Sequence, residues 1–326
     1  MRDKDKIVRH EKRSMAERLT NGCASHHDEI EAEEVTIPVP WGHVSGKWWG
    51  PRNVQPILGL HGWQDNAGTW DTLAPLLVAA GHALLSLDLM GHGLSAHFPK
   101  GQFYSLYWDG VMLIRRVCRH FAWDKVVLLG HSLGGAIAFL YAATYPDKVV
   151  NKFISIDIAA PVLRADERVV KESGRIMEKF LDYEDVLDET LPSYGYEEAM
   201  KLVLDAYKGS LTRESCEIML KRGLQRAANG KGFHFTRDVR LKLFGLNSLA
   251  RSTIMQFCKQ IRCEVLNIRA KPGIVFDEEG YYHEVVEAMR DTATQVLFCQ
   301  VEGTHHLHLN TPERVSPIIV NFLNNP

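Results

Sequence analysis

The sequence predicts an α/β protein with a doubly wound, mostly parallel sheet. Short apolar runs, typical of strands covered on both faces, alternate with stretches of helical composition. A Gly-x-Ser-x-Gly motif at residues 130–134 lies between one such run and one such stretch. The alternation is interrupted once, because residues 161–261 contain no convincing strand. This pattern indicates parallel strands joined by right-handed crossovers, with one long insertion.

The composition argues against several classes of protein. At 326 residues the chain can bury a substantial core, and 45% apolar and 24% charged residues are ordinary for a soluble protein. The net charge of −2 gives no reason to expect a nucleic acid or a membrane surface as partner. No run of about 18 apolar residues could span a bilayer, and we find no secretory or peroxisomal signal. The six cysteines lack a disulfide spacing, so we expect reduced thiols in a cytoplasmic protein.

We expect a charged, flexible leader over residues 1–33, with a short helix near Met15 to Leu19, and one folded domain over residues 34–326. Glu34–Pro40 and Val44–Trp49 are predicted to form an opening hairpin. Six parallel strands should follow it: Pro56–Leu60, Ala83–Asp88, Val126–Leu129, Phe153–Ile156, Val265–Ile268 and Val296–Val301.

Helices are predicted in the gaps between these strands, at Thr69–Ala80, Leu106–Phe121, Ala136–Tyr145 and Glu313–Leu323. The insertion lies between strands six and seven and should be an all-helical lid over the carboxyl ends of the strands. Its helices are predicted at Val169–Leu181, Tyr196–Tyr207 and Arg213–Ala228.

Ser132 is the predicted nucleophile. The apolar run at Val126–Leu129 precedes the motif and a helical stretch follows it, which is the context of a nucleophile elbow. A side chain at Gly130 or Gly134 would clash with the strained turn that exposes the serine hydroxyl. We therefore interpret Ser132 as catalytic.

A serine hydroxyl needs a base that a third group orients. The loop after the last strand carries His305, His306 and His308. His305 is the first of them that can turn back over the sheet edge after Gly303, so we expect it to be the base, with His306 next. A solvated or metal-binding histidine cluster is the alternative, against which we note that no acid or cysteine joins it at ligand spacing.

Two backbone N–H groups should stabilise the oxyanion. One belongs to Leu133, which follows the nucleophile, and the other to Trp63, in the loop after the Pro56–Leu60 strand. In the same loop Asp65 could cap the following helix. The turn Asp88–Ser95 is given a structural role, because nothing in it implies a reactive partner.

Together these motifs resemble the α/β-hydrolase superfamily over residues 34–326. More narrowly, the sequences at 39–42, 61–67 (His-Gly-Trp-Gln-Asp-Asn-Ala) and 235–241 (Phe-Thr-Arg-Asp-Val-Arg-Leu) look like the serine hydrolase-like, or kraken-like, family. The resemblance implies the α/β-hydrolase fold and a hydrolase that acts on an ester or a similar acyl bond.

The sequence departs from the superfamily at the triad acid. Most members place an Asp after the seventh strand, where this chain has Gly273. Asp157, at the end of the sixth strand, is the candidate we favour, since some relatives carry their acid there. Asp277 is the second candidate, within a cluster of three acids, and a dyad without an acid is the third possibility.

We expect a serine hydrolase that cleaves a small-molecule carboxylic ester through an acyl-enzyme and needs no cofactor and no metal. An acyltransferase with the same triad and a non-catalytic ligand-binding protein are the alternatives. Trp70, Trp108 and Phe139 are candidates for an acyl pocket, although core packing is the more common role for such residues. No pattern in the sequence specifies an oligomeric state.

Overall fold

The computed structural model describes residues 30–146, 149–186, 191–228, 230–243, 246, 248–275 and 280–325. The predicted helix near Met15 to Leu19 and the candidate acid Asp277 lie outside the described residues. Within the described chain, no helix is both long enough and apolar enough to cross a bilayer.

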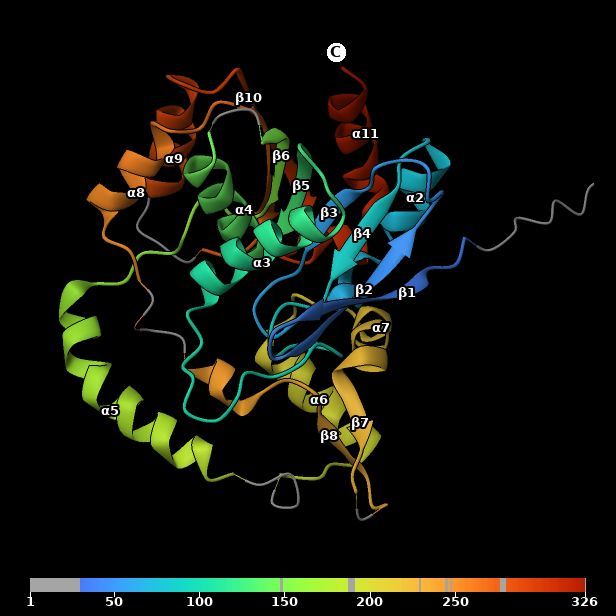
Figure 1. Ribbon diagram of the computed structural model, residues 1–326, viewed down its shortest axis with the longest axis vertical. Coiled ribbons are helices and arrows are strands. Elements are labelled where there is room, and N and C mark those ends of the chain that lie inside the picture. Colours follow the sequence, from blue (N-terminus) through green and yellow to red (C-terminus); the bar gives the residue numbers. More distant parts are fainter. Residues whose placement is uncertain are drawn as a thin grey trace, which may run out of the picture. The chain divides into compact units, whose positions relative to one another are not determined.

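An eight-stranded sheet forms the centre of the fold (Figure 1). Its strand order is β1-β2-β4-β3-β5-β6-β9-β10, with β1, β2 and β4 paired antiparallel and all other neighbours parallel. The opening hairpin and the six later strands are therefore confirmed. The strands are β1 (Glu33–Val39), β2 (Gly42–Trp49), β3 (Ile57–Leu60), β4 (Leu84–Leu87), β5 (Val126–His131), β6 (Val150–Ile156), β9 (Glu264–Pro272) and β10 (Gln295–Gly303).

Helices cover both faces of the sheet, as a doubly wound topology requires. One hydrophobic cluster joins the sheet to α3, α4, α8 and α9, and a second joins it to α2 and α11. The helical elements around the sheet are η1 (Ala67–Trp70), α2 (Ala74–Ala79), α3 (Leu106–His120), α4 (Leu133–Thr144), α8 (Arg251–Cys258), α9 (Tyr281–Arg290), α10 (Leu307–Asn310), η4 (Pro312–Arg314) and α11 (Ser316–Asn324).

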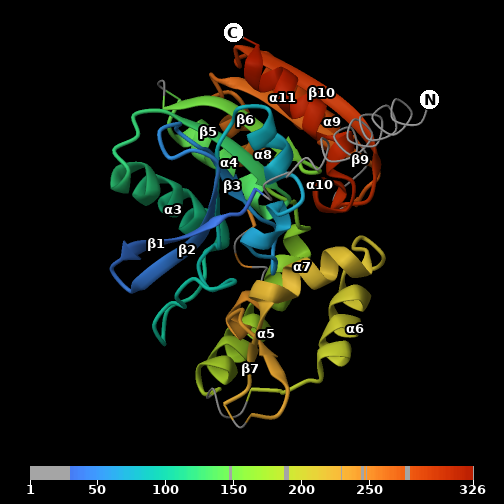
Figure 2. The ribbon, with the colours of Figure 1, turned by 90° about the vertical axis from the view of Figure 1, so that its right-hand side faces the viewer.

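The insertion between β6 and β9 lies beyond one end of the sheet in both views (Figures 1 and 2). The prediction that it is all-helical is wrong, because it contains an antiparallel pair of short strands. The helix expected over Arg213–Ala228 ends at Gly223, and the chain turns back between the strands through Gly230 and Gly232, both at positive φ. Three-residue strands are too short for a sequence pattern to reveal. The elements are α5 (Asp166–Glu184), α6 (Tyr196–Ala206), α7 (Arg213–Gly223), β7 (Leu224–Arg226), β8 (Phe233–Phe235) and η3 (Val239–Lys242).

A buried ion pair fastens the insertion to the sheet. The Arg222 guanidinium, at the end of α7, donates to the Asp88 carboxylate at 2.7 Å, and Asp88 is fully buried after β4. Asp88 also accepts the backbone N–H groups of Ala67 and Leu94, at 2.7 and 2.9 Å. The structural role predicted for this turn is confirmed, because the Asp88 carboxylate binds the two loops and the end of α7 through these hydrogen bonds.

Candidate active site

Ser132 lies on a strained turn between β5 and α4. Its φ of 50° and ψ of −117° fall in a region that side-chain-bearing residues rarely adopt. A Cβ at Gly130 would come within 2.4 Å of the Gly134 backbone, and one at Gly134 within 2.2 Å of the Leu60 oxygen. The glycines are thus required by close backbone approach, and the predicted strand, tight turn and helix are confirmed.

The structure brings His305 and Asp157 together. His305 Nδ1 lies 2.6 Å from Asp157 Oδ2, and both side chains are buried. Asp157 follows β6 at a φ of 53° and also accepts the backbone N–H groups of Ala270 (2.9 Å) and Ile274 (3.3 Å). A carboxylate on Nδ1 holds the imidazole in the tautomer whose Nε2 is free to accept a proton.

The other two histidines of this loop form hydrogen bonds with hydroxyl groups and not with a carboxylate. His306 Nδ1 lies 2.7 Å from the Ser210 hydroxyl, and His308 Nε2 lies 2.9 Å from the Thr69 hydroxyl. Both are buried, and no described carboxylate forms a hydrogen bond with either ring. Of the three histidines, His305 alone has the carboxylate partner expected of a base.

The loop after β3 approaches the elbow closely. A Cβ at Gly62 would lie 3.0 Å from the His131 ring and 3.4 Å from Ser132 Cβ, so glycine lets this backbone reach the serine. The Trp63 indole N–H donates to the Leu241 oxygen at 2.8 Å, which ties the loop to the insertion. Leu133 is the first residue of α4, where a backbone N–H has no partner within the helix.

The capping role considered for Asp65 is wrong. The Asn66 side chain caps the following 3₁₀ helix by accepting the Gly68 N–H at 2.9 Å. Asp65 instead accepts the Asn66 N–H at 2.6 Å and is buried. The two adjacent residues offer the same chemistry, and only the backbone direction decides between them.

Ser132, His305, Trp63 and Leu133 line one pocket of about 540 Å³. The insertion supplies most of its other walls, with apolar side chains of α6 and α7 and the hairpin residue Phe235. Trp70, Trp108 and Phe139 are not among the lining residues. Trp70 and Phe139 are fully buried in the core, whereas Trp108 is exposed.

A family profile for the alpha/beta hydrolase fold matches residues 55–229, which is more than half of the 326 residues. The chain belongs to the α/β-hydrolase family. A Drosophila melanogaster protein named "Probable serine hydrolase" is 48% identical over 291 residues, 89% of this chain and 87% of that protein. The hydrolase resembles an esterase of Mycobacterium tuberculosis at 30% identity over 167 residues, 49% of this chain and 54% of the esterase.

Among solved structures, a hypothetical protein from Pseudomonas aeruginosa superposes on this hydrolase with a TM-score of 0.78. The two chains are 27% identical, and the match covers 90% of this chain and 100% of the other. Fold and relatives agree, and the protein is a hydrolase of the α/β fold.

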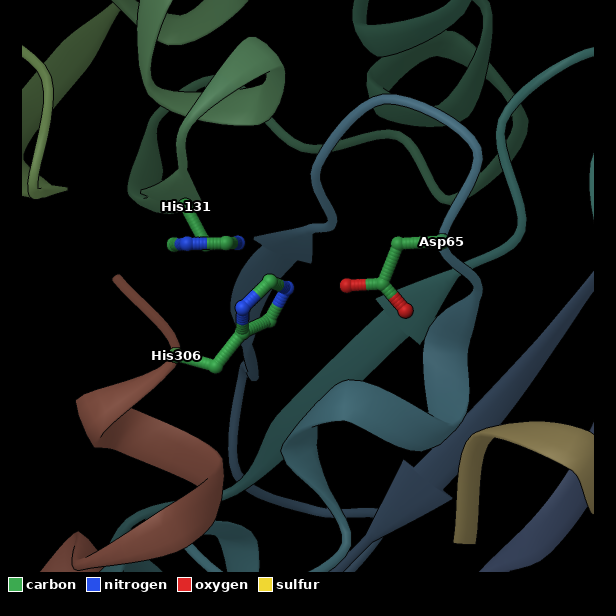
Figure 3. Close-up of side chains that lie close together, drawn as sticks. All are labelled: Asp65, His131 and His306. Atoms are coloured by element: carbon green, nitrogen blue, oxygen red, sulfur yellow. The ribbon is translucent and has the colours of Figure 1, made fainter. Parts of the chain in front are cut away.

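One side-chain cluster in the hydrolase has the donors of a metal site. Ligand atoms of Asp65, His131 and His306 lie within 4.8 Å of one another, and the three side chains converge from the β3 loop, the elbow and the loop after β10 (Figure 3). Asp65 Oδ2, His131 Nδ1 and His306 Nε2 have no hydrogen-bond partner among the described residues. Two imidazoles and one carboxylate can bind Zn²⁺. Sequence spacing does not reveal this cluster, because Asp65 and His131 lie far from His306 in the chain.

Electrostatics within this cluster favour neutral rings. Burial, together with the neighbouring imidazoles, holds the pKa of His131 and His306 well below the usual range. Burial raises the pKa of Asp65 to about 7, so this carboxyl can retain a proton at neutral pH. The cluster can thus hold either a proton or a cation between its three acceptors.

Sequence reasoning missed the residues that the insertion brings to the site. The Tyr207 hydroxyl donates to the Trp63 oxygen at 3.3 Å, and the Ser210 oxygen accepts from the Thr304 hydroxyl at 2.7 Å. No local motif marks Tyr207 or Ser210, since their partners lie about 100 residues or more away in the chain.

Proposed function

We propose that the hydrolase cleaves a carboxylic ester through an acyl-enzyme, with Ser132, His305 and Asp157 as catalytic triad. Ser132 Oγ attacks the ester carbonyl carbon while His305 Nε2 takes the hydroxyl proton. The tetrahedral intermediate expels the alkoxide, which leaves as an alcohol with the proton from His305. Water then attacks the acyl-serine, His305 takes a proton from it and returns it to Ser132, and the carboxylic acid departs.

The observation that carries this proposal is the buried 2.6 Å hydrogen bond between His305 Nδ1 and Asp157 Oδ2 beside a pocket that Ser132 also lines. Ser132 and Asp157 both adopt positive φ values, and such strain in residues with side chains clusters at active sites. The carboxylate stabilises the imidazolium that forms when His305 takes the serine proton.

The oxyanion is stabilised by two backbone N–H groups, those of Leu133 and Trp63. The Leu133 group comes from the first turn of α4, where the helix dipole also favours a negative charge. Removing one such donor typically costs about 10²–10³ in kcat. In this proposal the chain's own groups perform the whole reaction.

The substrate class is a small-molecule ester, and the insertion acts as the lid that shapes its pocket. Apolar side chains of α6 and α7 line the pocket next to Ser132, which suits an acyl chain. The similarity to the mycobacterial esterase also supports an ester over other acyl bonds.

A fluorophosphonate probe tests the proposal directly, because it labels only activated serines. We expect wild type to be labelled and to hydrolyse 4-nitrophenyl esters, with the preferred acyl length reporting the pocket depth. Ser132→Ala should lose both the labelling and the hydrolysis. A folded wild type that is neither labelled nor active would contradict the proposal and favour a non-catalytic ligand-binding protein.

A further inference from the structure

Arg237 is a pocket residue that has no acid beside it among the described residues. It follows β8 within the Phe-Thr-Arg-Asp-Val-Arg-Leu stretch at 235–241 and lines the same pocket as Ser132. Among the described residues, its guanidinium makes no hydrogen bond and no ion pair, and its Nε atom is buried without a partner. The Arg237 side chain is half-buried in the pocket wall, and no acid among the described residues balances its charge.

Two arginines close to Arg237 in the sequence are each paired with a buried acid. Arg222 pairs with the buried Asp88 at 2.7 Å, and Arg240 pairs with the buried Asp238 at 2.7 Å. An acid beside a buried guanidinium offsets the cost of removing that charge from water. Each of these two arginines thus has an acid, whereas Arg237, which lies between them in the sequence, has none in the described part of the structure.

The surroundings of Arg237 hold it in place without neutralising it. Its Cζ atom lies 4.1 Å from the centroid of the Phe235 ring, a cation–π contact. The positive charge of Arg237 opposes the rise in pKa that burial causes at Tyr207, which lines the pocket, and helps to lower the pKa of Lys242. Stacking on an aromatic ring orients the planar group and leaves its N–H donors available to a ligand.

The pocket as a whole carries positive charge. Its described lining includes no Asp and no Glu, but it includes four cations: Arg164, Arg168, Lys208 and Arg237. Arg164 and Arg168 both lie near Glu172, at 3.7 and 3.1 Å. Arg237 differs from these two because no acid lies beside it within the described part of the chain, so its guanidinium is available to an anionic group of a ligand.

We propose that Arg237 binds a carboxylate of the substrate, so that the preferred substrates are esters that carry a second, anionic end. The inference rests on the proposed ester hydrolysis for its kinetic test. A guanidinium pairs with a carboxylate through two parallel N–H···O bonds, which fixes the orientation as well as the charge of the ligand. Arg237 would thereby place the ester bond at Ser132.

The test compares two series of esters of rising chain length. One series is the mono-4-nitrophenyl esters of straight-chain dicarboxylic acids, and the other is the same compounds with the free acid capped as a methyl ester. We expect wild type to prefer the anionic series in kcat/KM by about 10-fold or more at one chain length, through a lower KM. That length reports the separation of Arg237 from Ser132.

Substitutions at Arg237 sharpen the test. Arg237→Met should abolish the preference for the anionic series, and Arg237→Lys should restore part of it, because lysine keeps the charge without the planar fork. Arg226→Met is the matched control, since Arg226 lies on the same hairpin over the Phe233 ring but is exposed and does not line the pocket. It should keep the preference.

Two further measurements separate ligand binding from a structural role. Arg237→Met should leave the melting temperature unchanged or raise it, because no acid among the described residues pairs with the Arg237 charge, whereas loss of a structural arginine would lower it. Calorimetric titration of Ser132→Ala with glutarate and longer diacids should show binding that is lost in Ser132→Ala/Arg237→Met.

The possible results distinguish the two proposals. Hydrolysis of both series at equal kcat/KM at every length, or an unchanged anionic preference in Arg237→Met, would overturn the role of Arg237 and leave ester hydrolysis standing. Absence of hydrolysis and of probe labelling in wild type would overturn the proposed function, while diacid binding by Ser132→Ala would still support an anion site at Arg237.

Discussion

The carboxyl ends of β6 and β9 are neighbours in the sheet and contribute different things to the same site. Asp157 directly follows β6 and its carboxylate contacts His305, whereas β9 is followed by Gly273, and none of the described residues there supplies a carboxylate. What the β9 end supplies is backbone N–H groups, from Ala270 and Ile274, which hold the two carboxylate oxygens of Asp157. The acid and its support thus come from different strands.

The glycine at the β9 end and the acid at the β6 end are physically linked. A Cβ at Gly273 would lie 2.9 Å from Asp157 Oδ1 and 2.6 Å from the Ala270 oxygen, and the φ of Gly273 is +56°. The backbone of β9 can therefore wrap around the Asp157 carboxylate only because position 273 has no side chain. A side chain at position 273, including that of an acid, would therefore disturb the site of the Asp157 carboxylate.

The largest expected effect is that of Asp157→Asn. Loss of the carboxylate favours the wrong imidazole tautomer of His305, and in a well-studied triad this change costs about 10⁴ in kcat. We expect a loss of this order in the hydrolysis of 4-nitrophenyl esters. Asp277→Asn is the control and should retain activity, because three consecutive acids in a sequence usually belong to a solvated surface, where a carboxylate contributes little. The opposite ranking would assign the acid to the β9 side.

A smaller effect is expected from Gly273→Ala, which leaves the acid in place but crowds it. The positive φ and the clash with the Ala270 oxygen should cost about 1–3 kcal/mol in the free energy of unfolding. Displacement of Asp157 should lower kcat roughly 10- to 100-fold. Urea unfolding and ester kinetics measure the two effects.

Gly280→Ala is the matched control for Gly273→Ala. Gly280 also has a positive φ (92°), but nothing lies within 4 Å of its Cβ position. It should lose stability through backbone strain and keep its kcat. An equal drop of kcat in both variants would show that the crowding of Asp157 does not matter.

The smallest effect is expected from Tyr282→Phe, two contacts away from the acid. The Tyr282 hydroxyl donates to Asn267 Oδ1 at 2.7 Å, and Asn267 Nδ2 donates to the Ile158 oxygen at 2.8 Å, one residue after Asp157. Loss of the first bond should cost about 1 kcal/mol in the free energy of unfolding, without a change in kcat. A large loss of kcat would show that the β9 side positions the acid through Asn267 as well as through its backbone.

Much of the fold was predictable because its signals are local. The strands of the sheet are short apolar runs, and the elbow is marked by Gly130 and Gly134 within five residues of chain. The β7–β8 hairpin was not predictable, since its three-residue strands pair across a glycine turn and carry no periodicity. The choice of Asn66 over Asp65 as helix cap likewise depends on backbone angles that composition does not encode.

By itself, the sequence determined where a nucleophile can stand, because a strained turn needs glycines at fixed spacing around Ser132. It also limited the acid to a few positions, since the carboxyl ends of parallel strands meet at one edge. Only the tertiary structure decided which of the described acids contacts His305, because that depends on the parallel pairing of β6 with β9 and on the space left by Gly273. The same holds for Arg237, because only the path of the insertion places it in the pocket beside Ser132, with no described acid next to it.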